Sequence, residues 1–249
     1  MQYTKLLVFA LFFSLLSLPA GVKAGEMTVS AAASLTNAFN ELKTVYEKSH
    51  SGLTVFVNYA ASNPLLKQIQ EGAPVDVFAS ADQETMDKAD AAKVVLPGTR
   101  KDFVRNTLVL IVPKGQAKPT KIENLTSFKR IAIGNPDSVP AGRYAKQVFE
   151  KASLWDKLQP SFILGTNVRQ VLDYVARGEV DCGIVYGTDA KKQADKVDVA
   201  MVLQGHKPIL YPIAVINTGK NAKEGQAFID FVLSNEAQAI LEKYGFAKP

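Results

Sequence analysis

The sequence predicts an α/β protein with largely parallel sheets. Short runs of β-branched and apolar residues alternate along the chain with stretches whose apolar residues recur at helical spacing. This alternation is typical of strand–helix–strand units. Several of the strand-like runs end in small or polar residues that open the next helix. The chain has 249 residues, 47% of them hydrophobic, which is enough for one large core or two smaller ones.

The first 24 residues have the features of a secretory signal peptide. Lys5 precedes an apolar run over residues 6–18, and Pro19 and small residues follow it up to Ala24. The run is shorter than the roughly 20 apolar residues needed to span a bilayer, and no cysteine directly follows it. We therefore expect residues 1–24 to be removed after Ala24 and the mature chain to be periplasmic, without a lipid anchor.

The first half of the mature chain is predicted to alternate four strands with three helices. The first helix is indicated by a single apolar face, on which Leu35, Ala38, Phe39, Leu42 and Tyr46 recur at helical spacing. The other elements follow from the same two periodicities. The predicted strands are 27–31, 53–59, 75–80 and 107–115, and the predicted helices are 35–46, 65–72 and 81–92.

The second half continues the alternation and suggests how the chain divides. Its predicted strands are 130–136, 161–165, 182–187, 197–203 and 210–216, and its predicted helices are 143–152, 167–179, 189–196 and a pair over 223–246 that breaks near Ser234 and Asn235. The strands could form one sheet or two. We favour two lobes, because the strand 210–216 could return the chain to the first one. The expected lobes are residues 25–104 plus 212–249, and residues 105–211.

Four strand-to-helix junctions are candidates for an anion site. The first turn of a helix leaves backbone N–H groups without partners and carries partial positive charge. Ser34 and Ser62 lie at two junctions, the segment Pro140, Ala141 and Gly142 at a third, and residues 166–170 at the fourth. Each serine could instead serve only as a helix cap, and the glycine could serve a tight turn or a close backbone approach.

Catalytic and metal-binding patterns are scarce. The sequence has only two histidines, His50 and His206, and it contains neither HExxH, nor paired cysteines, nor a phosphate-binding GxxxxGK[ST] loop. A hydrolase that uses Ser34 or Ser62 with His206 remains an alternative. Asp76, Asp82 and Asp181 lie near strand ends and could supply a carboxylate pair, but we expect solvent-facing or capping roles for them. The single cysteine, Cys182, is expected to be a buried core residue.

The charge pattern argues against nucleic acid as a partner. The formal net charge is +5, and the lysines are scattered without the interleaved aromatic residues of a nucleic-acid groove. A mildly positive surface would help to attract an anion. An adhesin or other surface protein also fits an exported chain, but it leaves the four small-residue helix starts unexplained.

Several segments, in their order and spacing, resemble the periplasmic molybdate-binding proteins of ABC transporters, a group of two-lobed periplasmic binding proteins. These segments are AAASLTNAF (31–39), AAS (60–62), GAPVDVFASAD (72–82), VPAGRYAK (139–146), NVRQ (167–170), GIVYGTDA (183–190) and the terminal YGF. The resemblance covers essentially the whole mature chain. It implies two α/β lobes, each with a mostly parallel sheet flanked by helices, joined by hinge strands, with a tetrahedral oxyanion held between them.

The resemblance also implies the ligand contacts and the partners. Hydroxyl and amide groups of Ser34 and Ser62, the amides of Ala141 and Val168, and the phenol of Tyr186 would hold molybdate or tungstate. No catalytic residue, cofactor or resident metal is implied. The expected partners are an inner-membrane ABC permease and its ATPase, and the protein is expected to be a monomer. Asn63 and Pro64 depart from the small or hydroxylated residues expected there, which questions the shape of that turn.

A site built only from donors has a consequence for selectivity. Burying a dianion is very unfavourable unless hydrogen bonds satisfy its oxygens. Such a site also disfavours protonated phosphate, whose O–H group would face another donor. Sulfate has the same charge and shape as molybdate but is smaller, so cavity size would have to separate the two. A sulfate carrier of the same fold therefore remains an alternative.

Overall fold

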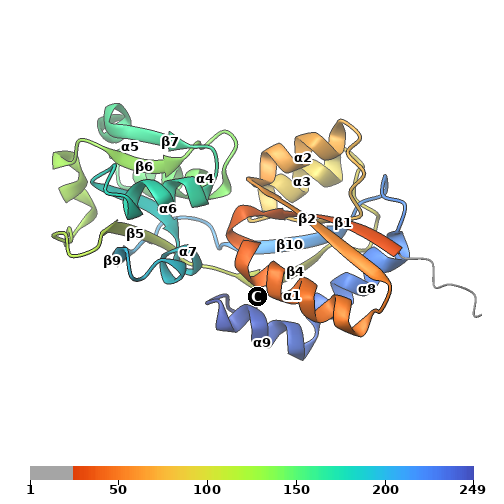
Figure 1. The fold of residues 1–249 in the computed structure, drawn as a ribbon. Helices are drawn as coiled ribbons and strands as arrows, with labels where there is room; N and C mark the ends of the chain where they lie inside the picture. The colour runs from red at the N-terminus through yellow and green to blue at the C-terminus, as the bar shows by residue number, and fades with distance from the viewer. Residues whose placement is uncertain (1–24) are drawn as a thin grey trace, which may run out of the picture.

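The computed structural model describes residues 25–249, so the predicted signal peptide and its cleavage after Ala24 lie outside the described residues. The described chain forms two lobes, each built on a five-stranded sheet (Figure 1). Within residues 25–249, no helix is both long enough and apolar enough to cross a membrane. The predicted α/β fold class is confirmed.

The first lobe contains a sheet with the strand order β2-β1-β3-β10-β4. Its strands are β1 (Gly25–Ala32), β2 (Leu53–Ala60), β3 (Val77–Ala79), β4 (Lys101–Arg105) and β10 (Leu210–Val215). Its helices are the 3-10 turn η1 (Ala33–Leu35), α1 (Thr36–Ser49), α2 (Ser62–Gln70), α3 (Gln83–Ala91), α8 (Ala222–Leu233) and α9 (Asn235–Lys243). Helices α2 and α3 cover one face of the sheet, and α1, α8 and α9 cover the other (Figure 1).

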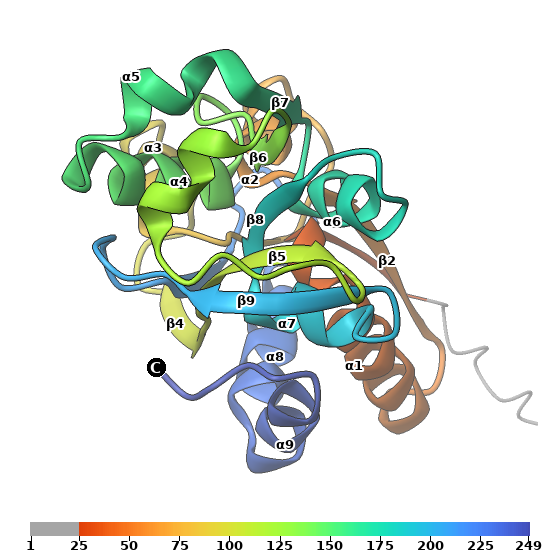
Figure 2. The ribbon, with the colours of Figure 1, turned by 90° about the vertical axis from the view of Figure 1, so that its left-hand side faces the viewer.

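The second lobe contains a sheet with the strand order β7-β6-β8-β5-β9. Its strands are β5 (Leu108–Pro113), β6 (Ile131–Gly134), β7 (Phe162–Gly165), β8 (Cys182–Tyr186) and β9 (Val197–Val202). Its helices are η2 (Ile122–Ser127), α4 (Pro140–Lys151), α5 (Trp155–Leu158), η3 (Gln159–Ser161), α6 (Val168–Ala176) and α7 (Gly187–Lys192). Figure 2 looks onto this lobe, with the edge strand β9 and its neighbour β5 in front.

Each sheet is mixed rather than fully parallel. In the first, β1, β2 and β3 pair in parallel, whereas β10 runs antiparallel to both β3 and β4. In the second, β6, β7 and β8 pair in parallel, and β5 runs antiparallel to β8 and β9. One strand is therefore reversed in each sheet. The reversed strands β5 and β10 are those that the chain enters when it crosses between lobes.

The chain crosses between the lobes twice. It passes from β4 to β5 through residues 106–107 and returns from β9 to β10 through residues 203–209 (Figure 1). The predicted strand 210–216 thus joins the first sheet, which makes this lobe discontinuous in sequence. The lobe limits 25–104 plus 212–249 and 105–211 stay a prediction. Strand β4 was not predicted, because only Phe103 and Val104 are buried among its charged neighbours.

The cores follow the predicted periodicities. The apolar face of α1 is buried, and Tyr46 at its end packs edge-on against Phe228 of α8, with ring centroids 5.1 Å apart. Cys182 is fully buried, as predicted, and burial raises the pKa of its thiol. It therefore behaves as a small apolar core residue.

Gly142 allows helix α4 to approach strand β6 closely. A Cβ atom at this position would lie 2.0 Å from the carbonyl oxygen of Gly134, a distance that no side chain tolerates. Of the two roles considered for this glycine, the close backbone approach is the one observed. The contact fixes the first turn of α4, and with it Ala141, at the carboxyl end of β6.

Candidate functional site

A small cavity lies between the lobes, at the carboxyl ends of the parallel strands of both sheets. The space there that protein atoms do not fill is about 200 Å³, open solvent included. The residues that line it are Ala32, Ala33, Ser34, Ala61, Ser62, Ala81, Val139, Pro140, Ala141, Val168 and Tyr186. All five residues that the resemblance indicated are therefore brought together, from both lobes.

Four of these five residues occupy first turns of helices. Ser62 and Val168 are the first residues of α2 and α6, Ala141 is the second residue of α4, and Ser34 is the second residue of η1. Backbone N–H groups at these positions have no partner within their own helix. The cavity is thus surrounded by unpaired amides at positively polarised helix ends.

Neither serine is a helix cap. The N-cap residues of η1 and α2 are Ala32 and Ala61, and neither helix start has a side-chain capping hydrogen bond. The Ser62 hydroxyl instead accepts a hydrogen bond from the backbone N–H of Ala81, at 3.0 Å. Because its oxygen already accepts, its own hydrogen remains available to a group in the cavity.

A hydrogen-bond chain orients the hydroxyl of Ser34 in the same way. The Asn106 Nδ2 atom donates to the Tyr211 hydroxyl at 3.2 Å, and the Tyr211 hydroxyl lies 3.0 Å from Ser34 Oγ. Since an amide nitrogen can only donate, Tyr211 accepts from Asn106 and can give its own hydrogen to Ser34. The hydrogen of Ser34 is then free to point into the cavity.

Tyr186 brings a buried hydroxyl with no protein partner. Its side chain is 1% exposed, and within the described residues its hydroxyl makes no hydrogen bond. Burial raises the pKa of Tyr186 well above its ordinary value, and the neighbouring Tyr211 adds to this effect. The phenol therefore stays protonated near neutral pH and can donate. An unsatisfied buried hydroxyl is unfavourable by itself, which indicates a ligand that would accept its hydrogen.

Two arginines bridge the lobes on either side of the cavity. Arg143 of α4 donates to Asp82 Oδ2 from Nε at 2.9 Å and from a terminal nitrogen at 2.5 Å. Arg169 of α6 donates to Asn37 Oδ1 at 2.8 Å and to the backbone carbonyl of Ser34 at 3.2 Å. Arg143 and Arg169 lie in the first turns of α4 and α6, and Ala141 and Val168 in the same two turns line the cavity. The bridges therefore hold the two halves of the site together.

The roles predicted for the aspartates are confirmed for two of them and wrong for Asp76. Asp82 caps α3, accepting from the backbone N–H of Thr85 at 3.2 Å, and it is also buried because it pairs with Arg143. Asp181 is exposed, as predicted. Asp76, by contrast, is buried and accepts from the backbone N–H groups of Thr28 and Asn221. These contacts join residues far apart in sequence, so local patterns could not reveal them.

The Asn63–Pro64 segment does not disturb the site. Pro64 lies in the first turn of α2, where its missing N–H has no intrahelical partner to lose. The Asn63 side chain donates to the backbone carbonyl of Asp137 in the other lobe at 2.8 Å and accepts from Thr85 Oγ1 at 2.7 Å. The asparagine thus adds another contact between the lobes.

The chemistry of the lining selects for an anion. The lining consists of amides, hydroxyls and apolar atoms and contains no charged side chain. Within residues 25–249, no group of three or more side chains is suited to hold a metal ion. The ring nitrogens of His206 face the carbonyls of Lys207 and Leu203, so this histidine is not in contact with either serine. In the part of the chain that the structure describes, His206 therefore does not form the catalytic pair with Ser34 or Ser62 that the hydrolase alternative requires.

The fold and the site define a two-lobed solute-binding protein with a small anion cavity between its lobes. Comparison with known proteins supports this class. Residues 27–247 match the family of bacterial extracellular solute-binding proteins, and the chain belongs to this family, which is a transport family and not an enzyme family.

Individual relatives cover nearly the whole chain. It is 42% identical to the putative ABC transporter substrate-binding lipoprotein YvgL of Bacillus subtilis, over 88% of this chain and 85% of the relative. It is 39% identical to the molybdate-binding protein ModA of Escherichia coli, over 89% of each chain. Among solved structures, the periplasmic molybdate-binding protein of Azotobacter vinelandii superimposes with a TM-score of 0.79 at 26% identity, covering 90% of this chain and 99% of the other.

Proposed function

We propose that this protein binds molybdate between its two lobes and delivers it to an ABC-type importer. The observation that carries the proposal is the set of donors around one small cavity, of which the partnerless Tyr186 hydroxyl is the most telling. The likeness to proteins named as molybdate-binding supports the same ligand. The ligand residues we assign are Ser34, Ser62, Ala141, Val168 and Tyr186.

We call the donors of these five residues the cage. Their hydrogen-bonding energies favour a dianion. The hydroxyls and amides together offer about seven hydrogen bonds, each worth roughly 1.5–3 kcal/mol when the acceptor is charged. Together these hydrogen bonds offset the free energy that is lost when the anion leaves water, although the lining carries no formal positive charge. Because every polar group in the cage can act as a donor, monohydrogen phosphate, whose O–H needs an acceptor, is disfavoured.

Tungstate has the same charge as molybdate and nearly the same size, so we propose that it binds the same cage. We propose a periplasmic protein that acts as a monomer, without cofactor or catalysis, and that docks on an inner-membrane permease with its ATPase. The Bacillus relative is named a lipoprotein.

Titration calorimetry tests the choice of ligand. The mature protein is expected to bind molybdate with a stoichiometry of one, and sulfate at least roughly tenfold more weakly, because a smaller anion leaves some donors out of reach. Adding sulfate in moderate excess should leave the molybdate titration almost unchanged. Tight sulfate binding with no molybdate heat would instead identify a sulfate carrier of this fold.

A further inference from the structure

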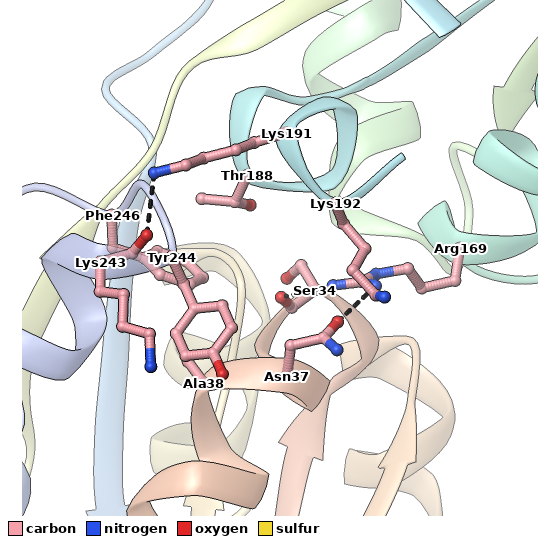
Figure 3. A pocket seen from close by; sticks show the side chains of 10 residues that line it. All are labelled: Ser34, Asn37, Ala38, Arg169, Thr188, Lys191, Lys192, Lys243, Tyr244 and Phe246. Carbon is pink, nitrogen blue, oxygen red and sulfur yellow. Dashed lines mark hydrogen bonds between the residues drawn. The ribbon is translucent and has the colours of Figure 1, made fainter. Parts of the chain in front are cut away.

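A second, larger hollow adjoins the cavity, between helices α1 and α9 of the first lobe and α6 and α7 of the second (Figure 3). Its space that protein atoms do not fill is about 660 Å³, open solvent included, against about 200 Å³ for the cavity measured in the same way. We call this hollow the cationic recess, because basic side chains and no acidic one line it. The four basic residues are Arg169, Lys191, Lys192 and Lys243. Ser34 lines both spaces.

Two of the four charges are compensated by acids that lie outside the lining. Arg169 Nε lies 2.6 Å from Oδ1 of the buried Asp189, as a close ion pair rather than an aligned hydrogen bond. Lys243 Nζ lies 2.8 Å from Glu41 Oε2. These two basic residues therefore add little net charge to the recess.

The other two charges are not compensated. Lys191 Nζ donates to the backbone carbonyl of Lys243 at 2.8 Å, which orients the ammonium group but leaves its charge in place (Figure 3). Lys192 is exposed, and within residues 25–249 its ammonium group has neither an ion pair nor a hydrogen bond. Figure 3 shows Lys192 extending toward Arg169 and Asn37, on the side of the recess where Ser34 lies.

We propose that the cationic recess attracts the oxyanion and guides it to the cavity, so that Lys192 accelerates association without belonging to the cage. This inference rests on the proposed function. The cage itself has no formal charge, and the field of dipoles fades over short distances. A recess with uncompensated lysines supplies the longer-range attraction, and such steering raises association rates by roughly 10- to 1,000-fold in strongly charged clefts. Selection among anions is then left to the neutral cage.

The rate of association at different salt concentrations tests the inference. Molybdate binding would be followed by stopped-flow protein fluorescence for wild type, Lys192→Gln and Lys192→Glu, from about 10 mM to about 500 mM salt, a range over which the screening length falls from about 30 Å to a few ångströms. At low salt we expect a graded loss in association rate, reaching roughly tenfold for Lys192→Glu. The dissociation rate should change by less than about twofold, and the three proteins should converge at high salt.

Lys48 provides a matched control. It is exposed in the last turn of α1, roughly 16 Å along the helix from Asn37, which lies in its first turn and lines the cationic recess. Lys48→Gln and Lys48→Glu change the net charge equally and should leave the association rate nearly unchanged. Equal rates for Lys192→Glu and Lys48→Glu would overturn the inference, and so would a change confined to dissociation. A wild-type protein that gave no molybdate signal at all would contradict the proposed function itself, and with it this inference.

Discussion

Replacing Val168 with proline is expected to weaken molybdate binding by roughly 10- to 100-fold while leaving the fold of the free protein intact. Proline lacks the backbone N–H, so the change deletes one of the proposed donors, and a hydrogen bond to a charged group contributes roughly 1.5–3 kcal/mol. Val168 is the first residue of α6, a position that proline favours. The preceding Asn167 is extended, with φ −159° and ψ 171°, and so avoids the helical conformation that a following proline disfavours.

The matched control for this change is Val168→Ala, which shortens the same side chain but keeps the amide. Calorimetry should show that Val168→Ala retains most of the affinity, and thermal unfolding without ligand should be similar for the two variants. Equal molybdate affinity in Val168→Pro and Val168→Ala would show that this amide does not contact the anion.

Replacing Tyr186 with phenylalanine is expected to have opposite effects on the free and the bound protein. The Tyr186 hydroxyl is buried without a protein partner, so its removal should leave the free energy of unfolding unchanged or raise it by up to about 1 kcal/mol. In the complex the same hydroxyl donates to the anion, and its loss should weaken binding by roughly tenfold or more. Thermal unfolding with and without molybdate, together with calorimetry, measures both effects.

Tyr211→Phe provides the contrast, because Tyr211 is equally buried but its hydroxyl contacts both Ser34 and Asn106. Its removal should destabilise the free protein by roughly 1–3 kcal/mol, since the Asn106 amide loses one of its two acceptors and keeps only Thr188 Oγ1. It should also weaken binding, because Ser34 is no longer oriented. If Tyr186→Phe destabilised the free protein as strongly as Tyr211→Phe, the Tyr186 hydroxyl would have a structural role and its assignment as a ligand would be wrong.

Periodicity alone was enough to predict most of the fold. The apolar face of α1 is buried as its spacing required, and the break between α8 and α9 falls at Ser234, which caps α9. Elements with few buried residues escaped prediction. Strand β4 has two buried residues between charged ones, and α5 is a single short turn whose only buried residue is Leu158. Local patterns are weak where tertiary packing decides the conformation.

The candidate site was predictable only in part. Helix starts with small residues indicated Ser34 and Ser62, but only the structure showed that neither serine is a helix cap. The residues that orient them left no signal in the sequence. Tyr211 lies 177 positions from Ser34, within a strand, and Asn106 lies in a crossing between lobes. Such contacts depend on how the two lobes close, which no local pattern encodes.

The central claim is that helix starts of both lobes direct their free donors to one bound anion. X-ray diffraction at the molybdenum absorption edge, from crystals grown with molybdate, tests it most directly. We expect one anomalous peak in the cavity, with the anion oxygens about 2.7–3.2 Å from the donors of Ser34, Ser62, Ala141, Val168 and Tyr186. A peak in the cationic recess or on the outer surface, with none in the cavity, would contradict the account.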